Sequence, residues 1–385
     1  MQTLIELYDE NPIENVLGTE MFRPKTTVLL CPQEEASGMK ASLEKYFSYR
    51  KCNARLVIVP VSLVDASKVE KRLREVLEQF DDCTIDISGG TDAALFAAGA
   101  VGGDTSVITY SRRKNSFFEI RNAAFARGCP CTVRLDARSC FLMAGGTLLP
   151  GRENSEELKG RTADIDRLFS VFRKFRKMWN RQISYMQRIS SSEPGKLEAQ
   201  GDRVIRGDQG TLTVNEDLLR ALAGAGLIRD LQVTDTQVRF SFPDETVRFW
   251  LRDIGAVLEL IVFKTCLEAR CFDDVVLSAV VNWEGGKNQR NAVTNEIDVV
   301  AVRGIQPIFI SCKTNEIRTE ALNELSILRD RFGGKYARAM IVTSANATAS
   351  RALSRMRASE LNIEVVEWND LLSGRLLKTL QQEPR

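Results

Sequence analysis

The chain has 385 residues, enough for two or three domains. Its 53 lysine and arginine residues nearly balance 51 acidic residues, so a net charge of +2 excludes a polycation and requires any nucleic-acid surface to be a local patch. The chain contains no histidine, which excludes Ser-His-Asp and Cys-His nucleophile activation, histidine-ligated zinc and every nuclease chemistry that depends on histidine.

The first part, residues 1–152, alternates strand and helix patterns. The apolar runs predict strands at 26–31, 54–61, 84–88 and 106–110, with helices at 39–50, 66–80 and 93–101 between them. This alternation predicts an α/β domain with a Rossmann-like, mostly parallel sheet. Short strands at 116–120 and 132–135 are expected at an antiparallel edge.

Two loops of this domain suit a ligand, because ligands bind beyond the carboxyl ends of the strands in such sheets. Glycine lets the backbone approach a phosphate, and a helix N-terminus offers it free amides. The candidate ligand-binding residues are Pro32, Gln33, Ser88, Gly89, Gly90 and Thr91. A plain turn with a glycine pair explains the second loop equally well, and the lack of a GxGxxG motif disfavours a dinucleotide cofactor.

Residues 153–195 contain a long basic helix, expected at 161–189. It has two interpretations: an inter-domain or dimer helix with a solvated charged face, or a helix whose basic face guides nucleic acid. Residues 196–245 predict a small winged-helix-like connector with a helix at 214–223 and a strand at 237–242.

The last part, residues 246–385, carries the most informative pattern. Apolar runs at 297–302 and 308–314, joined by a Gly/Pro break, predict a hairpin. Side chains alternate between faces, so Glu296 and Asp298 are expected to share one face, and Ser311 and Lys313 likewise. If the register joins these faces, Asp298 and Lys313 converge, with Asp298 expected at an exposed tip.

This pattern suits phosphodiester hydrolysis, which needs a divalent cation to neutralise charge and acidify a water. Hard cations prefer carboxylate and carbonyl oxygens, and a lysine beside them stabilises the charged transition state. Glu259, in the apolar helical stretch 254–262, would add a second carboxylate to Asp298. The alternative is a surface ion pair, which contributes only about 0–1 kcal/mol.

Glu259, Asp298 and Ser311-Cys312-Lys313, with the helix at 321–332 and the strand at 339–343, resemble the PD-(D/E)xK nuclease superfamily. The resemblance implies a restriction-endonuclease-like α/β domain with Lys313, Asp298 and Glu259 as catalytic residues. It also implies Mn²⁺ or Mg²⁺ bound by Asp298, Glu259 and the backbone carbonyl of Cys312. The superfamily usually has Asp or Glu where this chain has Ser311, so Ser311 or Glu296 would supply the remaining ligand.

The stretch 86–91, Asp-Ile-Ser-Gly-Gly-Thr, resembles the strand and loop of CARF domains, the CRISPR-associated Rossmann-fold sensors of cyclic oligoadenylate. CARF domains often continue with lysine, where this chain has Asp92. The two resemblances together imply an ancillary nuclease of type III CRISPR antiviral defence. Such a protein would be a homodimer that binds cyclic tetra-adenylate across its two CARF domains and then cleaves DNA, RNA or both.

Two alternatives stay open. One is a restriction- or repair-type endonuclease with a structural N-terminal domain. The other is a catalytically dead nuclease, marked by Ser311, that persists as a nucleic-acid-binding sensor module.

The nine cysteines do not have the spacing of zinc or disulfide sites. No CxxC pair occurs, and Cys129-Pro130-Cys131 has the wrong spacing for a zinc knuckle. Their odd number fits a reducing compartment, and no apolar run reaches the length of a membrane span. We therefore expect a cytoplasmic protein that makes no membrane contact.

Overall fold

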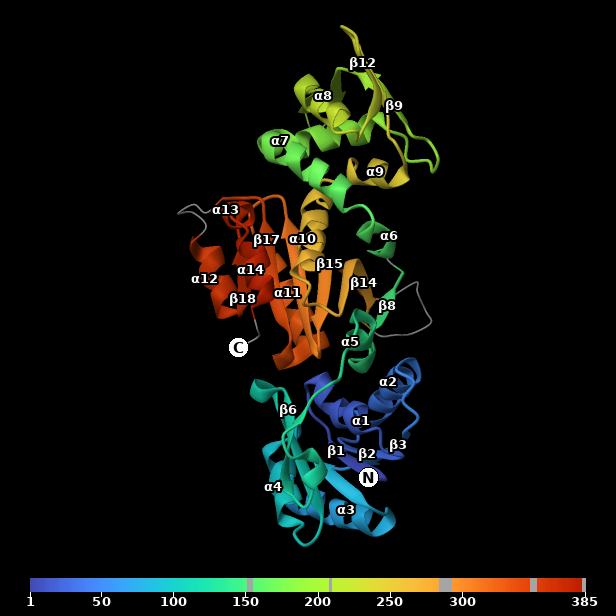
Figure 1. The fold of residues 1–385 in the computed structure, drawn as a ribbon, viewed down its shortest axis with the longest axis vertical. Helices are drawn as coiled ribbons and strands as arrows, with labels where there is room; N and C mark the ends of the chain where they lie inside the picture. Colours follow the sequence, from blue (N-terminus) through green and yellow to red (C-terminus); the bar gives the residue numbers. More distant parts are fainter. Residues whose placement is uncertain (151–154, 208–209, 284–292, 347–351, 383–385) are drawn as a thin grey trace.

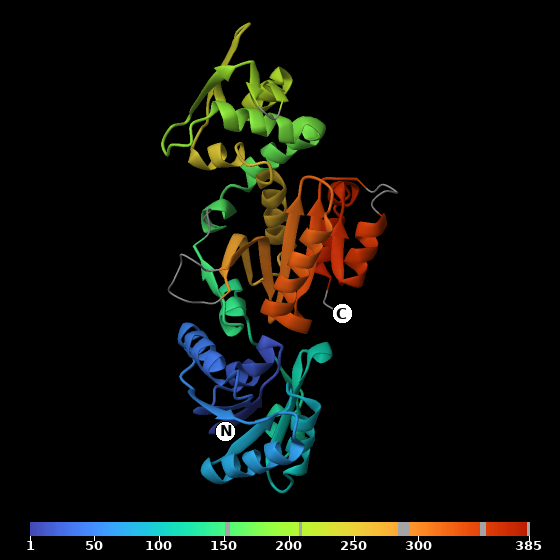
Figure 2. The same cartoon turned by 180° about the vertical axis from the view of Figure 1, so that it is seen from behind.

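The computed structural model describes residues 1–150, 155–207, 210–283, 293–346 and 352–382. The protein is a mixed α/β molecule with three parts in a row: the N-terminal sheet, a second sheet built largely from the C-terminal part, and a small helix-and-strand unit (Figure 1). The view from behind shows the N-terminal sheet and the small unit at opposite ends, with the C-terminal sheet between them (Figure 2).

The N-terminal sheet has seven strands in the order β3-β2-β1-β4-β5-β6-β7. The strands are β1 (Thr3–Leu7), β2 (Thr26–Cys31), β3 (Arg55–Pro60), β4 (Cys83–Asp86), β5 (Ser106–Ser111), β6 (Ser116–Arg121) and β7 (Cys129–Pro130). The first five pair in parallel, and β6 and β7 form an antiparallel edge, so the predicted Rossmann-like sheet is confirmed.

Two details of this sheet differ from the prediction. The central strand β1 was missed, because a five-residue run interrupted by Glu6 carries little apolar signal; the chain buries Glu6 by bonding it to Thr19. No strand forms at 132–135, where the chain has already left the sheet.

Helices cover both faces of this sheet. They are α1 (Leu17–Phe22), α2 (Ala36–Tyr49), α3 (Ala66–Gln79) and α4 (Asp92–Ala100), with short 3-10 helices η1 (Pro12–Asn15), η2 (Arg112–Lys114) and η3 (Ala124–Ala126). Side-chain caps fix two helix starts: Asp65 accepts from Ser67 and Lys68 at α3, and Thr91 accepts from Ala94 at α4.

The second sheet has the order β18-β17-β16-β15-β14-β8. Its strands are β8 (Thr147–Leu149), β14 (Asp274–Asn282), β15 (Thr294–Arg303), β16 (Gln306–Lys313), β17 (Arg338–Thr343) and β18 (Ile363–Val366). Its helices are α5 (Ala137–Met143), α10 (Ala256–Ala269), α11 (Thr319–Gly333), α12 (Ala352–Glu360), α13 (Trp368–Leu372) and α14 (Arg375–Gln381), and η5 (Gly334–Tyr336) follows α11. The predicted hairpin and its following helix and strand are present.

The strand β8 lies in this second sheet, paired with β14, although residues 1–152 were expected to form one N-terminal domain. The helix α5 also packs beneath the second sheet, where Phe141 stacks against Phe309. The chain therefore crosses to the second sheet before residue 137, and the expected boundary at 152/153 falls outside the described residues.

The small unit contains β9 (Glu198–Asp202), β12 (Arg229–Val233) and β13 (Gln237–Ser241) in one sheet, the hairpin β10 (Val204–Gly207) and β11 (Gly210–Thr213), and the helices α8 (Glu216–Gly224) and α9 (Glu245–Trp250). The long helix α7 (Thr162–Ile189) follows the short α6 (Ser155–Lys159) and kinks at Phe175. Its apolar side joins the small unit and α10 in one hydrophobic cluster, so α7 connects these two parts.

A second hydrophobic cluster joins the two large sheets. It runs from Leu4 and Ile108 in the N-terminal sheet through Phe141 in α5 to Phe309 and Phe332. Because these buried side chains form one continuous core, the two sheets pack directly against each other. In the described part of the chain, none of the helices combines the length and apolar character of a membrane span.

Candidate active site and ligand loop

The hairpin of β15 and β16 brings Asp298 and Lys313 together. Val299 lies opposite Ile310 in the antiparallel register, which places Asp298 beside Ser311. The Oδ2 atom of Asp298 accepts from the Cys312 amide at 2.5 Å and from the Ser311 hydroxyl at 3.2 Å, and the Lys313 ammonium lies 3.7 Å away. One carboxylate oxygen thus orients three consecutive residues of β16.

The strand is irregular at this carboxylate. Ile297 and Val300 pack on the α11 side of the sheet, while Val299 packs on the α10 side. The alternation of side chains between the two faces of the sheet is therefore interrupted at Asp298. The facing residue in β14, Ser278, has φ of +50° and is skipped in the register. The strict alternation used to place Glu296 and Asp298 on one face is therefore interrupted at this level in both strands.

Asp298 does not lie at an exposed tip, because its side chain is only 16 % exposed, against 39 % for Lys313. Burial raises the pKa of Asp298, while Lys313 and the hydrogen bonds from Cys312 and Ser311 act in the opposite direction. Burial also raises the pKa of the Cys312 thiol well above its usual value, so this neutral side chain packs in the core.

A pocket of about 470 Å³ opens beside these residues, lined by Gly255, Glu296, Ser311, Cys312 and Lys313. Its far wall is the N-terminal half of α11. The Glu259 carboxylate folds back over the start of α10, since a Cβ atom built on Gly255 would lie 2.7 Å from Glu259 Oε1. Glu259 is thus beside the pocket, and Glu296 is exposed on its rim.

The donor set suits a hard cation but is incomplete by itself. Across the described ranges, no group of three Asp, Glu or Cys side chains lies close enough to hold a metal ion. Mg²⁺ usually keeps several waters and binds through one or two carboxylates plus substrate phosphate oxygens. Asp298, Glu259 and the Cys312 carbonyl fit that mode, in which substrate and water complete the coordination.

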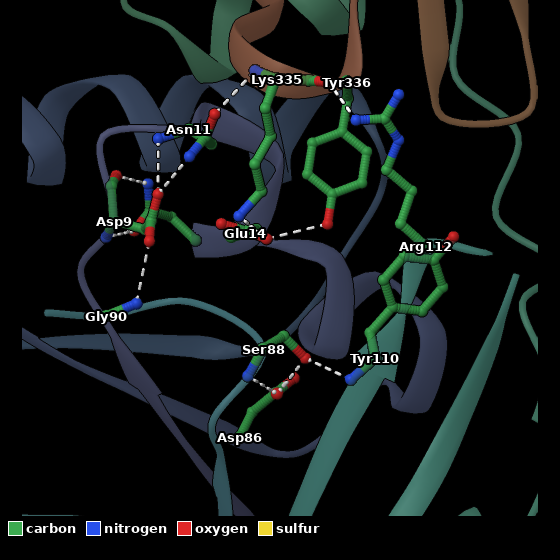
Figure 3. A network of polar contacts seen from close by, with 11 residues as sticks. Asp9, Asn11, Glu14, Asp86, Ser88, Gly90, Tyr110, Arg112, Lys335 and Tyr336 are labelled. Carbon is green, nitrogen blue, oxygen red and sulfur yellow. Dashed lines mark hydrogen bonds and ion pairs between the residues drawn. The ribbon is translucent and has the colours of Figure 1, made fainter. Parts of the chain in front are cut away.

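The candidate ligand loop is held from inside the N-terminal sheet (Figure 3). The Ser88 hydroxyl donates to Asp86 and accepts from the Tyr110 amide at 2.7 Å, and the Gly90 amide donates to Asp9 at 3.0 Å. Thr91 caps α4, and its hydroxyl donates to the Leu63 carbonyl at 2.5 Å. The hydroxyls and the Gly90 amide therefore already have protein partners.

Glycine is required at both positions by the backbone conformation and by close neighbouring side chains, and not by the approach of a ligand to an open surface. A Cβ atom on Gly89 would lie 2.8 Å from the Glu14 Cβ atom, and Gly90 has φ of +119° with Leu7 close by. The other candidate loop begins with half-buried Pro32 and exposed Gln33 after β2. Because β1 alone separates β2 from β4, both loops lie at the same edge of the sheet.

Next to this loop, η5 touches the N-terminal sheet through a cluster that we call the junction: Asn11, Glu14, Arg112, Lys335 and Tyr336 (Figure 3). The Glu14 Oε1 atom lies 2.8 Å from both the Lys335 ammonium and the Tyr336 hydroxyl. The Lys335 amide donates to Asn11 at 2.8 Å, and Arg112 donates to the Lys335 carbonyl and lies over the Tyr336 ring. No sequence pattern pointed to these residues.

Residues 244–383 match the family model of the Card1-like endonuclease domain. None of the curated proteins matches the chain. The fold of the whole chain is shared with solved structures. Protein VC1899 from Vibrio cholerae is 18% identical with a TM-score of 0.74, over 99% of this chain and 97% of that one. Can2 from Sulfobacillus thermosulfidooxidans, solved with cyclic tetra-adenylate, is 16% identical with a TM-score of 0.72, over 99% of both chains.

A type III CRISPR defence DNA nuclease activated by cyclic oligoadenylate is 14% identical with a TM-score of 0.50, and the match covers 99% of this chain and 52% of that one. The C-terminal part thus matches an endonuclease domain, as the resemblance predicted from the sequence implies, and the whole chain shares its fold with Can2 and VC1899.

Proposed function

We propose that the chain is a metal-dependent endonuclease of type III CRISPR defence, activated by cyclic tetra-adenylate at the N-terminal sheet. One observation carries the nuclease assignment: Asp298 and Lys313 meet 3.7 Å apart beside a pocket, inside the part that matches an endonuclease domain. The fold shared with Can2, whose structure contains cyclic tetra-adenylate, supports the choice of activator.

The residues at the pocket have two separate roles, metal binding and stabilisation of the transition state. Asp298, Glu259 and the Cys312 carbonyl would hold Mn²⁺ or Mg²⁺, which when bound neutralises charge on the phosphate and acidifies a water. The Lys313 ammonium, held in place by Asp298, faces the attacked phosphate and stabilises the negative charge of the transition state. No step needs histidine, in agreement with the composition.

The activator site that we propose lies at the edge carrying Gln33 and Thr91, both exposed. A homodimer would present this edge twice to one cyclic molecule. The loop contacts the junction directly, because Gly89 packs against Glu14. Hydrogen bonds from Ser88 to Asp86 and from Gly90 to Asp9 fix the rest of the loop. A movement of the loop on ligand binding would therefore shift Glu14.

The helix α11 connects the junction to the active site. Its last turn leads into η5, and its first half lines the pocket, so its 15 residues span about 22 Å between the two sites. A shift of η5 would therefore move the pocket wall.

The test is cleavage of supercoiled DNA and of single-stranded DNA and RNA, with and without Mn²⁺ or Mg²⁺, and with and without cyclic tetra-adenylate. We expect metal-dependent cleavage that the activator stimulates. Cleavage indifferent to the activator would favour a restriction- or repair-type enzyme instead. No cleavage with Mn²⁺ and activator would indicate a nucleic-acid-binding module without catalysis.

A further inference from the structure

A second pocket, of about 720 Å³, lies directly beside the active-site pocket. The two share a wall formed by Thr314, Asn315, Glu316 and Arg318, the loop that follows Lys313. The opposite wall of the second pocket is the basic helix α7, through Arg176, Lys177 and Asn180. The two pockets thus adjoin at this loop, and we call them together the groove, which extends from α7 to Lys313.

Hydrogen bonds from two elements fix the loop that forms the shared wall. The Asn180 amide donates to Thr314 Oγ1 at 3.3 Å and to Asn315 Oδ1 at 3.0 Å, which ties α7 to the loop. Thr343, the last residue of β17, donates to the Asn315 carbonyl, and the following Ser344 donates to the Thr314 carbonyl, both at 2.8 Å. The groove therefore has a fixed geometry that begins one residue after Lys313.

The α7 end of the groove carries positive charge that the protein does not neutralise with ion pairs. There Arg176, Lys177 and Arg318 face one carboxylate, Glu316, whereas Glu296, Glu320 and Glu324 line the active-site pocket. The Arg176 guanidinium donates to the Ser344 carbonyl and lies 4.6 Å from the centre of the Trp368 ring. Lys177 and Arg318 are exposed. Within the described residues, none of these three cations forms an ion pair.

Such an arrangement suits a phosphodiester backbone. A guanidinium matches phosphate geometry, and one fixed by stacking loses little entropy on binding. Two other arginines near the small unit have protein partners: Arg161 with Asp244, and Arg181 with the Thr211 carbonyl. Lys177 and Arg318, by contrast, line the pocket beside the active site without an ion pair to a described residue.

We propose that this groove binds the phosphate backbone of the substrate strand and leads the strand to Lys313, with Arg176, Lys177 and Arg318 as positioning residues. The proposal rests on the proposed nuclease function. Backbone binding carries no base information, so affinity is independent of sequence and falls with salt. DNA and RNA share this chemistry, so both are used in the test.

The test is the salt dependence of binding of labelled single-stranded DNA, duplex DNA and single-stranded RNA to the full chain without divalent metal. The variant is Lys177→Ala with Arg318→Ala. The matched control is Arg188→Ala, an exposed arginine on the same helix, about 16 Å further along its axis than Lys177. Arg318→Lys tests whether charge at that position is sufficient.

The slope of log affinity against log salt is negative, because affinity falls with salt. We expect each lost contact to reduce the magnitude of this slope by about 0.7 for single strands and by about 0.9 for duplex DNA. In cleavage assays KM should rise several-fold with kcat nearly unchanged, and Arg318→Lys should recover most of the affinity. The strand type that loses more contacts, calculated as the change in slope divided by the value per contact for that strand type, is the one that the groove accommodates.

An unchanged salt slope and KM in the double variant, or equal losses in Arg188→Ala, would overturn the groove assignment. This outcome is distinct from failure of the nuclease proposal. A wild type that binds strands through the groove but never cleaves would refute only the nuclease.

Discussion

The Glu14 carboxylate and the Tyr336 hydroxyl lie 2.8 Å apart, although 322 residues separate them in the chain. This hydrogen bond is buried and joins the part that carries the ligand loop to η5, which follows α11, the helix that lines the active-site pocket. Lys335 binds the same Glu14 oxygen, and Asp9 of the N-terminal part lies close to the carboxylate. Two residues of the endonuclease part thus hold the Glu14 carboxylate.

The first prediction concerns coupling through this contact. Tyr336→Phe removes the hydroxyl and keeps the ring that packs against Tyr110 and Arg112. We expect basal cleavage to persist and stimulation by cyclic tetra-adenylate to fall, measured as the ratio of initial rates with and without activator. The matched control is Tyr185→Phe, which removes a buried hydroxyl bonded to the Asp202 carbonyl in the small unit. Equal stimulation in Tyr336→Phe and wild type would refute coupling by this bond.

The second prediction concerns pH. Burial raises the pKa of Glu14 from 4.5 to about 7, and the nearby Asp9 adds to the rise, while Lys335 and Tyr336 oppose it. The folded state therefore keeps a proton that the unfolded state releases above pH 4.5, so this contribution to stability is lost as pH rises toward 7. The shift corresponds to about 3 kcal/mol in the free energy of unfolding.

Glu14→Gln removes the titration and serves as the comparison. Other buried carboxyls with raised pKa values, such as Asp86 at about 6, contribute in both proteins and cancel in the difference. Denaturant unfolding at several pH values should show wild type losing stability relative to Glu14→Gln between about pH 4.5 and 7. A difference that does not change with pH would contradict the prediction.

The third prediction separates the roles of Asp298 and Lys313. Asp298→Asn keeps the shape and an acceptor for the Cys312 amide but removes the negative charge, so we expect cleavage and metal binding both to be lost while the fold persists. Lys313→Ala should lower kcat by about 10²–10³-fold, the usual cost of losing one transition-state donor, with little effect on metal affinity. Wild-type turnover in Asp298→Asn would refute the site assignment.

The fourth prediction follows from Ser311, where a neutral hydroxyl stands in place of a carboxylate. We expect weak metal binding and higher activity with Mn²⁺ than with Mg²⁺, since Mn²⁺ binds more tightly and accepts irregular sites. Ser311→Glu should lower the metal concentration for half-maximal activity. If Glu296 supplies the ligand instead, Glu296→Ala should be as damaging as Asp298→Asn, and Ser311→Glu should have no effect or impair activity. Saturation of wild type by micromolar Mg²⁺ would contradict the prediction.

The sequence predicted local elements better than their long-range contacts. The hairpin that carries Asp298 and Lys313 followed from two apolar runs and a Gly/Pro break, because such patterns depend on neighbouring residues. The irregularity at Ser278 and Asp298 could not be predicted, since a positive φ at serine has no distinctive sequence signal. The pairing of β8 with β14 and the bond from Glu14 to Tyr336 join segments more than a hundred residues apart, which only the folded structure reveals.

The most direct test of the central claim is the rate of strand cleavage by wild type and Asp298→Asn in Mn²⁺, each with and without cyclic tetra-adenylate. We predict cleavage by wild type that rises with the activator, and none by Asp298→Asn under either condition. Cleavage by both proteins at equal rates would contradict the active site at Asp298. A wild-type rate that the activator leaves unchanged would contradict control by the N-terminal sheet.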